Sequence, residues 1–362
     1  MMIDRLWISA FRNIEKGLWI FEGQKRIGIL GKNGNGKSNF LESIYILING
    51  KSFRGSSLSD SLPFEGSKFS LGMDICGTRL YTEFMKEKGR SFQISGDYSD
   101  MASLKRAVQV SYFSSDIVRL LVESPDARRR ELDRFCKRYF GDVAQSAYSR
   151  YEAVLKQKNR SLKQQDPKMA RLFHDQLSDI AALVISFRHQ GLTLITDKIG
   201  SYHTNFPSIK GLSEVGFSYV SSAHDLGDAD KERPYSAMMK GFYEAHIAAE
   251  LAAGFSLYGP HRDDFSLFLG GRSMTRFYSR GVNKISNILF RLSTYELMKS
   301  QFGLPILLFD DVFAEIDADN QKGVLHLLED FSQLFFTGLT YNEVMEKDSV
   351  WYQIENGVME KK

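Results

Sequence analysis

The chain has 362 residues, of which 43% are hydrophobic and 25% are charged, and its formal net charge at pH 7 is +3. This length exceeds the usual limit of a single hydrophobic core, so one large domain with a second lobe is expected. The two cysteines, Cys76 and Cys136, form no CxxC pair, and no apolar run approaches the roughly 20 residues that span a bilayer. The composition therefore argues against a disulfide framework, a zinc site and a membrane partner, and it predicts a cytoplasmic protein.

A complete phosphate-binding loop lies near the start of the chain. An apolar strand over residues 27–30 precedes it, and a helix with an apolar stripe from Phe40 to Ile48 follows it, which is the context that this motif requires. The glycines let N–H groups point at a triphosphate, Lys37 reaches the β- and γ-phosphates, and Ser38 holds Mg²⁺. A chance glycine-rich turn before a helix is the disfavoured alternative. The predicted ATP-binding residues here are Gly31, Lys32, Asn33, Gly34, Asn35, Gly36, Lys37, Ser38 and Asn39.

The rest of the chain alternates between strand-like and helical patterns. Apolar runs separated by turn signals predict strands over 6–11, 68–74, 80–85 and 91–94. From about residue 115 to about residue 201 the patterns are helical, and Ser124 with Pro125 is a plausible N-cap and first-turn pair. Strand-like runs return after residue 254, and a helix is expected over about 319–330. We therefore predict an α/β fold in which residues 1–112 and 254–362 form an ATPase lobe and residues 113–253 form a helical insertion.

A second apolar strand, over residues 305–309, ends in the carboxylates Asp310 and Asp311. Beside a phosphate-loop strand, Asp310 would complete the Mg²⁺ site and Asp311 would position or activate water. The alternative is a buried strand followed by an acidic pair at a helix N-terminus, which the phosphate loop disfavours. Lys37 and Asp310 lie 273 residues apart, too far for a compact nucleotide kinase or small GTPase. This spacing is typical of an ATPase whose core is split by an insertion.

Residues 279–284 begin a further predicted helix. Ser279 and Gly281 at its start could offer a hydroxyl and N–H donors to a γ-phosphate, either in the same subunit or in a second one. A plain helix cap would have the same sequence. The predicted catalytic residues are thus Lys37, Asp311 and Ser279, Gly281 joins the nucleotide-binding set, and the metal ligands are Ser38 and Asp310.

Positive charge is concentrated in residues 119–171. This segment contains fourteen Lys or Arg against seven Asp or Glu, so its charge of +7 exceeds the +3 of the whole chain. Such a surface favours a polyanion, because each neutralised phosphate releases counterions. A solvated helix face is the alternative, and composition does not separate DNA from RNA. Arg128, Arg129 and Arg130 could contact DNA or stabilise the lobe internally. The aromatic residues interleaved with this charge, which could stack on bases or belong to the core, are Tyr139, Phe140, Tyr148 and Tyr151.

Several passages, in this order, resemble the RecF family of bacterial DNA repair ATPases, whose head is related to ABC and structural-maintenance-of-chromosomes proteins. The Gly-Pro-His-Arg-Asp-Asp passage together with Asp-Asp-Val-Phe is specific, whereas the phosphate loop alone is not. The similar passages are Phe11–Asn13, Asn39–Tyr45, Gly50–Arg54, Phe113–Asp116, Ser124–Asp133, Tyr258–Asp264 and Asp310–Asp317.

The resemblance implies an ABC-type ATPase head that forms an ATP-dependent homodimer, in which the signature helix of one subunit closes on the phosphate loop of the other. It also implies binding to DNA near single-strand/double-strand junctions and slow ATP hydrolysis. Cooperation with RecO and RecR in loading RecA is implied in the same way.

Several positions depart from the family pattern or have no assigned role. Val282 and Asn283 replace two glutamines of the signature, so an ATP-gated switch with negligible hydrolysis, a diverged relative, is the second hypothesis. Thr337 and Thr340 are the residues nearest to the expected γ-phosphate switch, which we do not assign. A third hypothesis, an ABC transporter subunit, is disfavoured because the Gly-Gly-Gln signature is absent. His261 has no second ligand at suitable spacing, so it is expected to stabilise a turn rather than to bind a metal.

Overall fold

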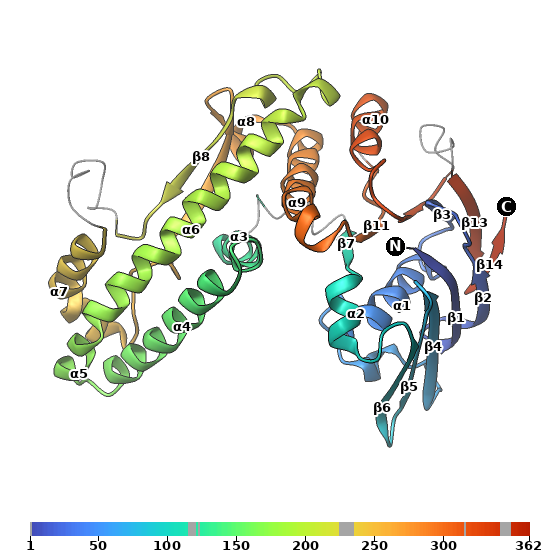
Figure 1. Ribbon diagram of the computed structural model, residues 1–362, viewed down its shortest axis with the longest axis horizontal. Coiled ribbons are helices and arrows are strands. Elements are labelled where there is room, and N and C mark those ends of the chain that lie inside the picture. The colour runs from blue at the N-terminus through green and yellow to red at the C-terminus, as the bar shows by residue number, and fades with distance from the viewer. Residues whose placement is uncertain (1, 115–120, 122–123, 224–234, 315, 341–348) are drawn as a thin grey trace. The chain divides into compact units, whose positions relative to one another are not determined.

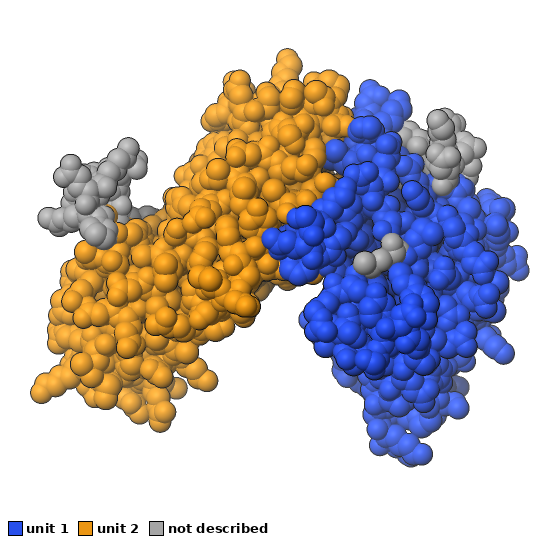
Figure 2. Space-filling model, in the orientation of Figure 1, with its two compact units in different colours: residues 1–118, 298–362 blue, residues 119–297 orange. Residues whose placement is uncertain are grey.

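The computed structural model describes residues 2–114, 121, 124–223, 235–314, 316–340 and 349–362. The chain forms two compact units, Met1–Val118 with Met298–Lys362, and Arg119–Leu297 (Figure 2). The predicted boundary between the lobes, at residue 113, lies close to the start of the second unit at Arg119. Residues 254–297, however, belong to the second unit and not, as predicted, to the first. The reason is strand pairing, because β9 (Asp264–Leu269) pairs antiparallel with β8 (Val215–Val220) inside that unit.

The first unit contains a five-stranded antiparallel sheet. Its strands follow the order β2-β1-β4-β5-β6, and alternate residues face the core, as in β1, where Leu6 and Ile8 are buried. The expected strands over 6–11, 68–74, 80–85 and 91–94 are confirmed, and β2 is an additional strand. The bounds are β1 Ile3–Phe11, β2 Ile14–Ile20, β4 Lys68–Ile75, β5 Thr78–Met85 and β6 Gly89–Gly96.

A six-stranded sheet completes this unit, in the order β14-β13-β3-β12-β11-β7. Its strands from β13 to β7 are parallel, and β14 pairs antiparallel with β13 at the edge. The carboxyl ends of parallel strands meet at one edge of a sheet, which is where ligands bind in open α/β folds. The strands are β3 Arg26–Leu30, β7 Val110–Ser114, β11 Ile306–Asp310, β12 Leu334–Gly338, β13 Ser349–Glu355 and β14 Val358–Lys361.

Helix α1 (Lys37–Asn49) contacts strands of both sheets (Figure 1). Its apolar stripe, including Phe40, Leu41 and Leu47, lies in one hydrophobic core with residues from both sheets. Strand β3 leads into this helix through the glycine-rich loop, so packing of α1 fixes the loop at the carboxyl edge of the parallel strands. The remaining helices of this unit are η1 Leu58–Ser61, α2 Met101–Ala107 and α10 Ala318–Leu327.

The second unit is mainly helical, with α6 contacting α4, α7 and the three-stranded sheet β10-β9-β8 (Figure 1). Ser124 is the N-cap position of α3 and Pro125 its first residue, as predicted, although the Ser124 side chain makes no capping hydrogen bond. None of the described helices is long and apolar enough to cross a membrane. The elements are α3 Pro125–Tyr139, α4 Gly141–Lys163, α5 Pro167–Leu172, α6 His174–Ser201, η3 His203–Asn205, η4 Leu212–Glu214, α7 Tyr235–Ala253, β10 Arg272–Ser273, α8 Met274–Phe277 and α9 Arg280–Phe302, which continues into the first unit.

Candidate nucleotide-binding site

The glycine-rich loop joins β3 to α1 and requires glycine for steric reasons. Gly34 and Gly36 have φ angles of 85° and 107°, in the region that residues with a side chain rarely adopt. A Cβ atom on Gly36, the N-cap of α1, would lie 2.9 Å from Asn13 Oδ1. Glycine therefore lets the loop backbone turn tightly into the N-terminus of α1, where the helix dipole favours an anion.

Lys37 places a buried positive charge in this loop. Its side chain is 5% exposed, and its Nζ donates hydrogen bonds to the carbonyl oxygens of Gly31 at 2.7 Å and Lys32 at 3.4 Å. Ser38 follows, half-buried in the first turn of α1. Among the described residues, this buried ammonium is bonded only to neutral carbonyls. Such a cation beside a helix N-terminus fits a triphosphate, and a hydroxyl next to it suits Mg²⁺.

Asp310 ends β11, which is separated from β3 by β12 rather than lying beside it as predicted, and the residue is 8% exposed. Both carboxylate oxygens accept hydrogen bonds from neighbouring strands: Oδ2 from the Tyr112 hydroxyl at 2.9 Å, and Oδ1 from Thr337 Oγ1 at 2.8 Å. Burial, with the Asp310 carboxylate adding to it, raises the pKa of Tyr112 well above its ordinary value, so the phenol stays protonated and donates. Asp311 follows with φ 51°, and its N–H donates to Thr337 Oγ1 at 3.0 Å.

Sequence reasoning did not identify Tyr112, and it named Thr337 only as a residue near a possible γ-phosphate switch. The structure instead directs the Thr337 side chain to Asp310 and Asp311. Tyr112 lies on β7, and no motif indicated that this strand borders β11. Both residues lie at the site because their strands, β7 and β12, flank β11 in the sheet.

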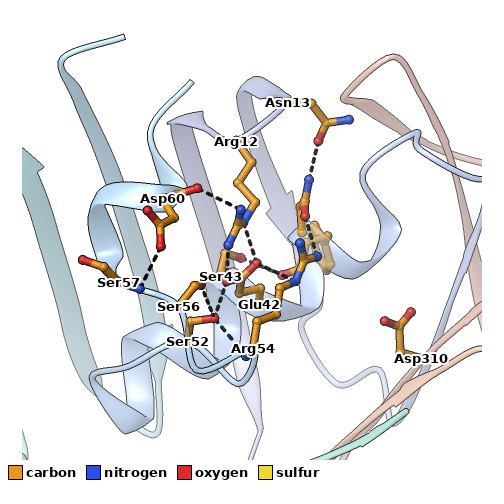
Figure 3. A network of polar contacts seen from close by, with 12 residues as sticks. Arg12, Asn13, Glu42, Ser43, Ser52, Arg54, Ser56, Ser57, Asp60 and Asp310 are labelled. Atoms are coloured by element: carbon orange, nitrogen blue, oxygen red, sulfur yellow. Dashed lines mark hydrogen bonds and ion pairs between the residues drawn. The ribbon is translucent and has the colours of Figure 1, made fainter. Parts of the chain in front are cut away.

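A second buried carboxylate, that of Glu42 on α1, is 0% exposed and is surrounded by donors (Figure 3). Arg12 donates to both of its oxygens, at 2.7 and 2.8 Å, and the Ser52 hydroxyl donates at 2.6 Å. Arg54 Nε lies 3.4 Å from Glu42 Oε2. The passages containing Arg12 and Arg54, which carried the family resemblance, are therefore fastened to the helix that follows the phosphate loop.

Hydrogen bonds connect this cluster to the loop itself (Figure 3). Arg54 donates to Asn39 Oδ1 at 2.7 Å, Asn39 donates to Asn13 Oδ1 at 2.7 Å, and Asn13 donates to the Gly34 carbonyl at 2.9 Å. Asn39 was predicted to bind nucleotide, and its side-chain amide is engaged with Asn13 and Arg54. These bonds tie the backbone of the glycine-rich loop to the cluster around Glu42.

Ser279 and Gly281 lie at the start of α9, in the second unit. Ser279 is exposed, and its Oγ accepts a hydrogen bond from the Val282 N–H at 3.4 Å, as a helix-capping hydroxyl does. Asn283 donates its side-chain N–H to the Tyr278 carbonyl at 3.2 Å. The contact of Ser279 and Gly281 with a γ-phosphate stays a prediction.

The arginines of the basic segment divide into internal and exposed residues. Arg128 donates to both oxygens of Asp264, at 2.8 and 2.7 Å, and Arg129 donates to the Asp263 carbonyl and pairs with Asp126. Of the two roles considered for these arginines, the structure supports internal stabilisation for Arg128 and Arg129. Arg130, by contrast, is exposed.

Six basic side chains of the segment are exposed and make no ion pair with any residue that the structure describes. They are Arg130, Arg150, Lys156, Arg160, Lys163 and Lys168. Tyr148 and Tyr151 are buried and belong to the core rather than to a base-stacking surface. Seven residues of the predicted passages lie outside the described part of the chain, namely Ser115, Asp116, Arg119, Leu120, Val122, Glu123 and Glu315.

His261 stabilises the turn in which it lies. Its Nδ1 is 2.7 Å from the Tyr151 hydroxyl and its Nε2 is 3.1 Å from the Ser256 carbonyl, so a neutral ring accepts at Nδ1 and donates at Nε2. Burial lowers the pKa of His261 to about 4. Both ring nitrogens are thereby used within the fold.

Comparison with known proteins assigns the fold and the family. The sequence model described as "RecF/RecN/SMC N terminal domain" matches residues 2–360. The DNA replication and repair protein RecF of Carboxydothermus hydrogenoformans is 30% identical over 369 residues, with 99% of each chain covered. The protein of that name from Halalkalibacterium halodurans is 28% identical over 390 residues, with 100% of both chains covered.

Two solved structures are similar in fold. The structure of the recombination mediator protein RecF-ATP superimposes with a TM-score of 0.75 at 23% identity, covering 99% of this chain and 97% of that one. An Smc head bound to the C-winged helix domain of ScpA gives a TM-score of 0.57 at 14% identity, covering 100% and 97%. The predicted α/β ATPase-head fold is confirmed. With a family match across almost its whole length, this chain belongs to the RecF family.

Proposed function

We propose that this protein binds ATP and Mg²⁺ and acts in DNA replication and repair as a DNA-binding ATPase. The observation that carries the proposal is the buried Lys37 ammonium in the glycine-rich loop, at the same sheet edge as Asp310. The relatives named DNA replication and repair protein RecF, and the similar structure titled RecF-ATP, support the same ligand and process.

Each residue has a physical task in this proposal. Lys37 and the N–H groups of residues 32–38 bind the phosphates, since they combine a buried cation with a helix N-terminus. Ser38 and Asp310 hold Mg²⁺, which neutralises charge that develops on the phosphate oxygens. Asp311, whose backbone is left-handed with φ 51°, positions or activates the attacking water.

The proposal extends to assembly. Ser279 and Gly281 cap the γ-phosphate of a second subunit, so ATP holds a homodimer together on DNA that contains a gap or a single-strand/double-strand junction. Exposed basic side chains of the second unit, such as Lys156 and Arg160, contact the phosphate backbone. Family membership supports RecO and RecR as partners in loading RecA.

Sedimentation with a gapped DNA duplex, with and without ATP–Mg²⁺, tests the proposal. Lys37→Met is expected to abolish ATP-dependent dimerisation on DNA, because it removes the only buried cation described in the loop. Lys68→Met, which changes an exposed lysine on β4, is the matched control and should sediment as wild type. Failure to bind any DNA with ATP present, at every salt concentration, would refute the DNA-binding function.

The altered signature supports a second candidate, an ATP-gated switch with negligible hydrolysis. Val282 has no side-chain donor, and the amide of Asn283 is bonded to the Tyr278 carbonyl. ATP turnover of wild type and Asp311→Asn separates the candidates. Equal, negligible turnover in both favours the switch, whereas a large loss in Asp311→Asn favours the ATPase.

A further inference from the structure

Two neutral hydroxyl groups, from the strands on either side of β11, hold the carboxylate of Asp310. The Tyr112 hydroxyl from β7 donates to Oδ2 at 2.9 Å, and the Thr337 hydroxyl from β12 donates to Oδ1 at 2.8 Å. All three side chains are buried. With one bond on each oxygen, the carboxylate cannot rotate about its terminal torsion without breaking both bonds.

The Thr337 hydroxyl also fixes Asp311, the residue that follows Asp310. It donates its proton to Asp310 and accepts the N–H of Asp311 at 3.0 Å, so one oxygen atom joins both carboxylate residues. Asp311 has φ 51°, which costs energy for a residue with a side chain unless the surroundings hold it. The hydrogen bond from its N–H supplies part of that support.

Tyr112 is itself held from its other side. Its ring stacks on Phe53, with ring centroids 3.5 Å apart and planes 9° from parallel. Phe53 stands between Ser52 and Arg54, both of which contact the buried carboxylate of Glu42. The position of the Tyr112 hydroxyl is thus linked through stacking to the helix that follows the phosphate loop.

We propose that Tyr112 and Thr337 are positioning residues of the nucleotide site, which orient the Asp310 carboxylate for Mg²⁺ and fix the turn at Asp311. A carboxylate has about four acceptor positions, so one hydroxyl on each oxygen leaves acceptor capacity for a cation. Removing a residue that hydrogen-bonds to a metal-binding carboxylate typically lowers metal affinity or activity about 10–100-fold. The assignment rests on the proposed function, since it requires Asp310 to be the metal ligand.

Three variants test the inference. Thr337→Val and Tyr112→Phe each remove one hydroxyl and keep the shape of the side chain, and Thr337→Ser retains the hydroxyl. Binding of a fluorescent ATP analogue is measured in EDTA and across a Mg²⁺ titration. We expect Thr337→Val and Tyr112→Phe to weaken Mg²⁺ affinity about 10-fold or more. Their affinity for the ATP analogue in EDTA should be unchanged. Thr337→Ser should resemble wild type.

Hydrogen exchange supplies a readout that does not depend on nucleotide. In a peptide covering residues 306–314, the Asp311 amide should exchange faster in Thr337→Val than in wild type or Thr337→Ser. The same difference should appear when every protein also carries Lys37→Met. Unchanged exchange, or equal Mg²⁺ affinity in wild type, Thr337→Val and Tyr112→Phe, overturns the positioning role. Equal impairment of Thr337→Ser and Thr337→Val also overturns it, because packing would then be the cause. If wild type binds no ATP while the exchange pattern appears, the proposed function fails and the hydrogen-bonded geometry stands without a role in metal binding.

Discussion

Lys158 on α4 and Glu250 on α7 form a completely buried ion pair in the second unit. Both side chains are 0% exposed, and Lys158 Nζ lies 2.6 Å from Glu250 Oε2 and 4.0 Å from the centroid of the Tyr243 ring. The other carboxylate oxygen of Glu250 accepts the Leu257 N–H at 3.0 Å. Lys158→Met keeps an unbranched chain of similar length and removes the charge, leaving the Glu250 carboxylate without its cation.

The expected cost follows from two opposing effects. At an effective dielectric constant of about 20, unit charges 2.6 Å apart attract by about 6 kcal/mol. The loss of hydration of both charges offsets most of this attraction, so the pair itself adds little to the stability. A charge left alone keeps its hydration penalty and loses its partner, and Lys158→Met or Glu250→Gln should each cost about 3–5 kcal/mol.

Urea unfolding of wild type, both single variants and the double variant Lys158→Met/Glu250→Gln measures the coupling between the two residues. The double variant should cost clearly less than the sum of the single variants, because neither buried charge then lacks a partner. The three tryptophans, Trp7, Trp19 and Trp351, all lie in the first unit. Their fluorescence reports that unit, while circular dichroism at the helical band weights the second. Additive costs, or single variants that lose less than about 1 kcal/mol, would refute the reasoning.

Three further outcomes are expected. Burial holds the pKa of His261 at about 4, below the ordinary 6.5, so the unfolded chain binds more protons between these pH values. The free energy of unfolding should therefore fall by about 3 kcal/mol as the pH is lowered from 6.5 toward 4. His261→Gln should flatten that part of a stability profile measured by urea unfolding at several pH values, and an unchanged slope would contradict the assignment. Glu42→Gln removes the partner of the mostly buried Arg12 and should lower stability by about 3 kcal/mol, seen as a lower Tm; an unchanged Tm would show that the cluster is not stabilising. Lys156 and Arg160 lie four residues apart on one face of α4, and replacing both with Gln should reduce the slope of log K against log salt for duplex DNA by about 2, whereas an unchanged slope would place the DNA elsewhere.

Part of the fold could be predicted because its signals are local. The strand, glycine-rich loop and helix around Lys37 are adjacent in the sequence, and β4 alternates apolar and polar residues. Strand β2 was not predicted, because it has apolar residues on both faces: Trp19 is buried whereas Leu18 and Ile20 are exposed. Such a strand shows no clear period of two.

The lobe boundary and the roles of the arginines depend on contacts between distant residues. Strands β8 and β9 pair although the long helix α7 lies between them in the sequence, and this pairing keeps residues 254–297 in the second unit. Arg128 meets Asp264 across 136 residues. Composition records only that an arginine is present, so it could not separate an internal ion pair from an exposed DNA-binding side chain.

The partners of the buried charges distinguish structural residues from functional ones. Glu42 is surrounded by arginines and Lys158 is paired with Glu250, so their charges are balanced within the protein. Lys37 and Asp310 are also buried, yet their hydrogen-bond partners among the described residues are neutral: carbonyl oxygens around the ammonium and hydroxyl groups around the carboxylate. Neither makes an ion pair within the part of the chain that the structure describes. Burying a charge without a counter-ion is costly, so a fold that does so twice at one sheet edge stores binding energy for ligands of opposite charge. A phosphate for Lys37 and a metal ion for Asp310 satisfy that requirement together.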